Sequence, residues 1–277
     1  LLVVIILVIL LVSLSNRPSI NTESNNTITT NTNTVNSTQN TQTQLPANNV
    51  QNSKILWSNT GTEWRAMEGA PSCDEPITFD APVDLGLATN ILYPGQTRGG
   101  DFKAHGGFIL GNNPDNNATV TLPMNANIYQ GARYIEAGEL QILLDFITPC
   151  GIMFRFDHLA AVGQEFKVYV DELPEPKVDS TITTQFSNQK LFSAGTVVAT
   201  KVGFVNTNNK SFDFGMYDLR GKNEASKDVV WATQYASKAT QAYYGVCWLD
   251  YLTANDKQFA KALPGPGTEG KTSVYCK

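Results

Sequence analysis

Short apolar runs alternate with turn residues from residue 118 to residue 217, and this pattern restricts the fold more than any other feature of the chain. The runs are rich in Val, Ile, Phe and Tyr, which favour strands, and Gly, Pro and Asn separate them. Strands that follow one another with almost no helical period between them favour an antiparallel sheet or sandwich. Pro149-Cys150-Gly151 predicts a hairpin turn between two of them. We therefore predict a mainly β fold with strands at 118–122, 139–147, 151–156, 165–170, 195–205 and 211–217.

The period changes toward the C-terminus, where apolar residues recur every three to four positions in two stretches. Thr253 with Asp256 then forms a capping-box pattern at the start of a further short helix. We expect residues 221–277 to form a helical extension that packs on a β domain at residues 54–220. The two stretches with helical period are 225–239 and 241–252.

The N-terminal end combines an apolar segment with a polar tract. Residues 1–15 are apolar apart from serine, and this run is shorter than the roughly 20 residues that a helix needs to span a bilayer. Two interpretations stand: a signal peptide with Ser13-Leu14-Ser15 as its cleavage site, or a membrane anchor whose first residues precede the sequence. Residues 16–53 are almost entirely Asn, Thr, Ser and Gln, which predicts a disordered linker. Both interpretations predict an extracellular or cell-surface protein.

Four cysteines, and no C-x-x-C motif, are typical of an exported chain with two disulfides. Of the three pairings that four cysteines allow, we predict Cys73–Cys150 and Cys247–Cys276, since the second pair brackets one C-terminal segment. Closing a loop of about 30 residues stabilises a fold by roughly 3 kcal/mol in the chain-entropy treatment.

Charge and motif content exclude several functional classes. The net charge is −5, 16% of residues are charged, and no cluster of Lys and Arg supplies a nucleic-acid footprint. A serine hydrolase elbow, G-x-S-x-G, is absent, and the glycine pairs lack the lysine and helix of a phosphate loop.

Only two histidines occur in the chain, and each lies in a distinctive phrase. His105 lies in GGDFKAHGGF and His158 in FRFDHL. Five phrases resemble, in the same order, motifs of the lysostaphin-type zinc peptidases (the LytM family). The resemblance implies that family's duplicated hybrid motif, whose core is an antiparallel β-sheet. The phrases are residues 99–108, 119–127 (TVTLPMNAN), 155–159 (RFDHL), 191–202 (LFSAGTVVATKV) and 211–219 (SFDFGMYDL).

The resemblance also implies a zinc site, which this chain matches only in part. In the family, zinc is held by a His, by an Asp four residues later and by the second His of an H-x-H pair, and it activates water for attack on a peptide bond. His105 matches the first ligand and His158 matches a proton-handling histidine. Ile109 stands where the Asp is expected, and the H-x-H pair becomes Ser211 and Asp213.

A rearranged metal site is one hypothesis for these residues. Asp101 lies four residues before His105, so Asp101, His105 and Asp213 together could bind zinc or another divalent cation. The alternatives are that Asp101 is a turn residue and that Asp213 is a hydrogen-bonded carboxylate in the former groove.

Three functions follow from this pattern. The first is an exported, membrane-tethered or free peptidase-fold domain with a degraded metal site that binds cell-wall polymer or peptide. The second is an active zinc metalloendopeptidase that hydrolyses cell-wall peptides through His158 and a rearranged site. The third is an extracellular structural or adhesive domain, indicated by the polar spacer and the two disulfides.

Overall fold

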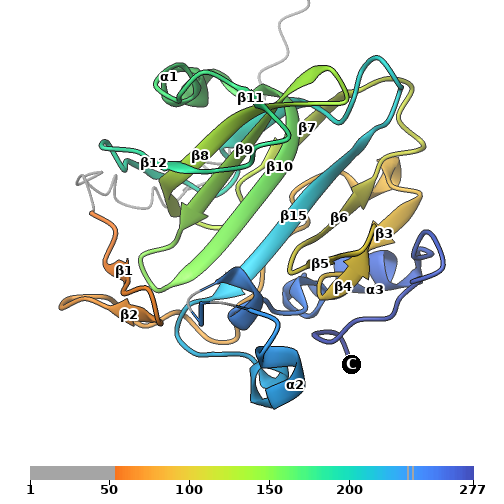
Figure 1. The fold of residues 1–277 in the computed structure, drawn as a ribbon. Helices are drawn as coiled ribbons and strands as arrows, with labels where there is room; N and C mark the ends of the chain where they lie inside the picture. Colours follow the sequence, from red (N-terminus) through yellow and green to blue (C-terminus); the bar gives the residue numbers. More distant parts are fainter. Residues whose placement is uncertain (1–53, 236, 239) are drawn as a thin grey trace, which may run out of the picture. The chain divides into compact units, whose positions relative to one another are not determined.

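A mainly antiparallel sheet is the centre of the fold in the computed structural model, which describes residues 54–235, 237–238 and 240–277 (Figure 1). The strands follow the order β11–β8–β9–β10–β15–β6–β3, and β14 pairs with both β10 and β7. Among the named strands of this sheet, β11 alone pairs in parallel, with β8. The prediction of a mainly β fold with a C-terminal helix is confirmed. The signal or anchor at 1–15 and the linker at 16–53 lie outside the described residues.

The strands and helices have the following bounds. The strands are β1 (Trp57–Asn59), β2 (Trp64–Ala66), β3 (Asn90–Leu92), β4 (Gln96–Arg98), β5 (Asp101–Lys103), β6 (Gly106–Ile109), β7 (Asn117–Thr121), β8 (Ala126–Glu136), β9 (Glu139–Ile147), β10 (Ile152–Val162), β11 (Lys177–Val178), β12 (Thr184–Gln185), β13 (Leu191–Phe192), β14 (Val197–Val202) and β15 (Ser211–Asp218). The α-helices are α1 (Lys167–Asp171), α2 (Val229–Ala232) and α3 (Ala254–Ala262). The 3₁₀ turns are η1 (Leu85–Leu87), η2 (Gln164–Phe166), η3 (Glu224–Lys227), η4 (Gln241–Tyr243) and η5 (Trp248–Tyr251).

Two tight turns join the long central strands β8, β9 and β10. Ala137 and Gly138 connect β8 to β9 with φ values of 50° and 77°, the left-handed pair that a two-residue type I′ hairpin requires. Between β9 and β10, the Gly151 amide donates to the Thr148 carbonyl at 3.1 Å. The predicted hairpin turn at Pro149-Cys150-Gly151 is therefore confirmed.

The sheet buries a different cluster on each face, because side chains alternate along a strand. On β10, Ile152, Phe154 and Phe156 belong to the main core. Met153 points the other way, into a second cluster rich in Trp and Tyr. The polar residues Arg155 and Asp157 share the face of Met153, and this face carries the candidate site.

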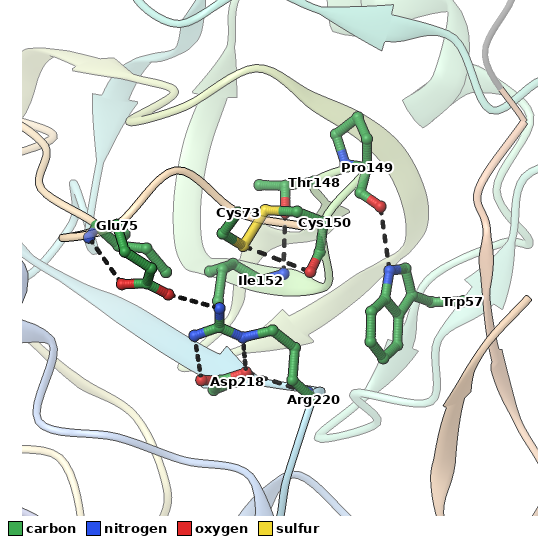
Figure 2. Close-up of a disulfide and its surroundings, with 10 residues drawn as sticks. Trp57, Cys73, Glu75, Thr148, Pro149, Cys150, Ile152, Asp218 and Arg220 are labelled. Atoms are coloured by element: carbon green, nitrogen blue, oxygen red, sulfur yellow. Dashed lines mark hydrogen bonds and ion pairs between the residues drawn. A yellow bond between two sulfur atoms is a disulfide. The ribbon is translucent and has the colours of Figure 1, made fainter. Parts of the chain in front are cut away.

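Both predicted disulfides are confirmed, and Figure 2 shows the first of them. Cys73–Cys150 ties the β9–β10 turn to the chain that follows β2. Trp57 supports the same turn from the other side, donating its indole N–H to the Pro149 carbonyl at 3.1 Å. Two disulfides in so small a fold indicate an oxidising environment such as the outside of the cell.

The predicted strand at 165–170 is wrong. These residues form η2 and α1, and they bury Phe166, Tyr169 and Val170. A spacing of three and four residues places these side chains on one helical face, so the helical period decided the structure although the residue types favour a strand.

The predicted long helices at 225–239 and 241–252 are also wrong, because this segment forms η3, α2, η4 and η5 instead. Val229 and Val230 are each 74% exposed, so the apolar period does not bury one face there. Tyr243 and Trp248 belong to different clusters on the two faces of the sheet, which one straight helix could not reach.

The final predicted helix is confirmed as α3, with Thr253 as its N-cap residue. The capping box does not form, since Thr253 makes no side-chain cap bond. Asp256 instead accepts a hydrogen bond from the Ala81 amide at 2.7 Å and holds α3 against the chain before η1.

The C-terminal segment shares the hydrophobic core with the β domain. Trp248, Leu249, Leu252 and Ala260 all belong to the main core cluster, and the described residues group as one compact unit. Within the described residues, no helix has the length and apolar character needed to cross a bilayer.

Candidate histidine–aspartate site

His105 lies just before β6, which packs closely against β15. The Arg98 side chain holds this approach by donating to the carbonyls of His105 at 3.2 Å and Tyr93 at 2.9 Å. Gly107 faces Asp213 across the β6–β15 pair, and a Cβ at Gly107 would lie 3.1 Å from Asp213 Cα. The glycines after His105 therefore allow β6 to approach β15 and bring the imidazole to the sheet.

Asp213 lies on β15, between Gly107 of β6 and Asp157 of β10. Its Oδ2 is 2.9 Å from Nε2 of His105, and both side chains are 16% exposed. Burial alone would raise the pKa of Asp213, but the charges and hydrogen bond of His105, with His158 and Arg98, hold that pKa well below its ordinary value of 3.8. Asp213 is therefore an ionised carboxylate.

His158 reaches the same carboxylate because β10 contains a bulge. The β9–β10 register shifts between Phe156 and Leu159, and His158 has a φ of 58°. In a regular strand, adjacent residues such as Asp157 and His158 would point to opposite faces. The bulge redirects the imidazole, whose Nε2 is 3.7 Å from Oδ2 of Asp213, and its side chain is 19% exposed.

Further polar groups surround His158. The Tyr134 hydroxyl donates to Asp157 at 2.7 Å and lies 3.3 Å from Nδ1 of His158, which is also 3.8 Å from Glu136 Oε2. The His158 amide donates to Asp157 at 2.8 Å. Burial raises the pKa of Asp157, and burial with the Asp157 charge raises the pKa of Tyr134, which therefore remains a donor.

We call His105, Asp213 and His158 the histidine cluster. The structure brings together three of the four residues predicted for the site. Asp101 lies apart from them: its side chain is 79% exposed, next to Lys103 at 3.7 Å, and β5 ends before His105. The extended strand that would have placed Asp101 and His105 on one face is absent there.

The positions that depart from the peptidase pattern lie opposite each other at the end of the site. Ile109 of β6 pairs with Ser211 of β15. The Ser211 hydroxyl donates to the Asn209 side chain at 2.5 Å, so it is engaged within its own turn.

The donor set does not fit a zinc ion. Among the described residues, no group of three or more His, Cys, Asp or Glu side chains is arranged to hold a metal. Asp213 and His105 are already joined at hydrogen-bond distance, and Ile109 offers no ligand atom. The cluster is therefore a hydrogen-bonding and charged site in which one carboxylate faces two imidazoles.

Sequence reasoning missed Tyr134, Glu136 and Arg98. Tyr134 and Glu136 are two residues apart on β8, so both side chains point to the same face. That spacing is visible in the sequence, but their contact with His158 depends on how β8, β9 and β10 pair.

No protein-family model, no curated protein and no solved structure matches this chain.

Proposed function

We propose that the chain is an extracellular binding domain with a lysostaphin-like sheet, whose degraded metal site holds a cell-wall polymer or peptide. The observation that carries the proposal is the convergence of the chain's two histidines, from β10 and from the start of β6, on Asp213.

The chemistry of the cluster favours binding over hydrolysis. Asp213 is an ionised acceptor, while the imidazoles supply N–H donors close to the surface. Peptide groups and polymer hydroxyls present both kinds of partner. Ile109 and Ser211 stand where the peptidase pattern needs metal and catalytic groups, so binding is the function that these residues retain.

Co-sedimentation with purified peptidoglycan, with chitin and cellulose as other wall polymers, tests this proposal. We expect the wild-type protein to bind one of these polymers and His105→Ala and His158→Ala to weaken binding about tenfold, as loss of roughly 1.4 kcal/mol would do. Asp101→Asn, an exposed carboxylate outside the cluster, is the matched control and should bind as the wild type does.

Two results would contradict the proposal. One is that none of the polymers binds, and the other is that both histidine variants bind unchanged. EDTA in the same assay should leave binding unaffected, and a loss of binding with EDTA would indicate that the cluster works through a metal.

A further inference from the structure

A second polar row crosses the same sheet face beside the histidine cluster. Arg155, Asp145 and Gln130 face one another on β10, β9 and β8. Arg155 and Asp157 are two residues apart on β10, so this row lies about 7 Å along the strands from the row of Asp213 and Asp157.

Internal hydrogen bonds fix the side chains of this row. Arg155 donates to both carboxylate oxygens of Asp145 at 2.8 Å, and the Gln130 amide donates to Asp145 at 2.7 Å. Asp145 is fully buried, so the ion pair is both bidentate and shielded from water. These side chains are ordered before any ligand arrives.

Arg155 and Gln130 of this row, and the neighbouring Tyr129, each keep one polar group unused. Arg155 contacts Asp145 through Nε and Nη2, which leaves Nη1 as a donor. Gln130 uses its amide nitrogen, which leaves its carbonyl oxygen as an acceptor. Tyr129 accepts from Gln185 at 2.6 Å, so its own hydroxyl hydrogen remains to donate. This part of the sheet face therefore presents hydrogen-bond donors and acceptors in fixed positions close to one another.

A cavity of about 220 Å³ opens over this row. Its lining includes Trp64, Tyr129 and Met153 as apolar walls and Gln130, Arg155 and Gln241 as polar groups. Ligand pockets for drug-sized molecules begin at roughly 300 Å³, so this one accommodates a single ring or side chain.

The charge of the cavity excludes an anion as the natural occupant. Arg155 is the only charged residue in its lining, and Asp145 neutralises it. A neutral ligand that has one apolar face and several hydroxyls matches aromatic walls beside amide and guanidinium groups.

We propose that this cavity is a subsite for one pyranose ring of a neutral glycan. The inference deepens the proposed function, since it names glycan as the polymer class that lies along the sheet face from the histidine cluster. Trp64 and Tyr129 contact the apolar face of the ring, while Arg155, Gln130 and Gln241 bind its hydroxyls.

Saturation-transfer NMR with cellotetraose and chitotetraose, and with tetra-alanine as a peptide probe, tests the subsite on the full chain. We expect a tetrasaccharide to bind and Gln241→Ala to weaken it about fivefold, the factor that corresponds to about 1 kcal/mol. Gln234→Ala, an exposed glutamine of the same segment outside the cavity, should bind as the wild type does. Trp64→Phe, which retains an aromatic ring but reduces the wall, should weaken binding as well.

The inference is overturned if neither tetrasaccharide binds, if Gln241→Ala binds as tightly as the wild type, or if tetra-alanine binds in place of the sugars. These outcomes are separate from those of the histidine variants. Wall-polymer binding that depends on His105 but not on Gln241 would support the proposed function and remove the glycan subsite. The reverse pattern would retain the subsite and remove the role of the histidine cluster.

Discussion

Asp213 determines how the two histidines of this chain are used. Its Oδ2 faces His105 at 2.9 Å and His158 at 3.7 Å, and those neighbours keep the carboxylate ionised although it is buried. An ionised group in the interior requires such partners, because its desolvation would otherwise cost several kcal/mol. The cluster is therefore a structural feature as well as the proposed binding site.

We predict that Asp213→Asn lowers the free energy of unfolding at pH 7 by about 1–3 kcal/mol, since it removes a charged acceptor from a buried hydrogen bond. The folded pKa of Asp213 lies below its unfolded value of 3.8. Its contribution to stability is thus complete above pH 3.8 and is lost as the pH falls through the folded pKa.

Urea denaturation at pH 7 and at pH 2–3 measures this contribution, and the difference in unfolding free energy between the wild type and Asp213→Asn should shrink at the lower pH. The same substitution at exposed Asp101 should have little effect at either pH, and an undiminished difference for Asp213→Asn at low pH would contradict the assignment.

At the scale of elements, an irregular strand and a close strand pair create the site. The bulge in β10 turns His158 toward Asp213, at the expense of a left-handed residue that costs roughly 1–2 kcal/mol in a non-glycine. On the other side, Gly107 lets β6 lie against β15. Without the bulge in β10, His158 would not point toward Asp213. Without the close β6–β15 pair, His105 would not reach Asp213.

We therefore expect Gly107→Ala to destabilise the protein by about 1–3 kcal/mol through overpacking. The added Cβ would lie 2.5 Å from the Phe212 carbonyl oxygen and 3.1 Å from Asp213 Cα, both of which are backbone atoms of a central strand. Gly221→Ala is the matched control, because a Cβ there meets nothing within 4 Å. Thermal unfolding of both variants decides the point, and equal melting temperatures would show that β6 and β15 can separate without cost.

At the scale of the whole molecule, the described chain is stabilised by a main core that its β-strands and its C-terminal segment share, and by two disulfides. The C-terminal segment contributes Trp248 and Leu252 to the core that β10 and β15 build, so it is part of the same folding unit. Cys247–Cys276 joins residues 29 apart, whereas Cys73–Cys150 joins residues 77 apart.

The two disulfides should differ in what they contribute. In the chain-entropy treatment, removing Cys73–Cys150 costs about 4 kcal/mol or slightly more, and removing Cys247–Cys276 costs about 1 kcal/mol less, because the longer loop gains more entropy when it is opened. Guanidinium denaturation of the paired Cys→Ser variants measures both values. The reverse order would indicate that native contacts around the C-terminal link outweigh loop entropy.

Local features of the chain allowed several parts of the structure to be predicted. The strand at 139–147 agrees with β9 in full, since a run of apolar and β-branched residues between turn residues carries the signal. The favoured cysteine pairing, one of three that the sequence allows, was also confirmed. In contrast, residues 165–170 contain strand-favouring types at helical spacing, and two local signals then conflict.

The sequence by itself indicated the β-rich class through composition, spacing and turn residues, which are properties of neighbouring positions, and it favoured the two disulfide pairs that form. His105, His158 and Asp213 became candidates through the resemblance to the peptidase motifs. Only the tertiary structure decided that β6, β15 and β10 lie side by side, that a bulge reverses the direction of His158, and that Asp101 is turned away to solvent. Register and strand order depend on contacts between residues far apart in the chain, and one residue of shift exchanges the two faces of a sheet.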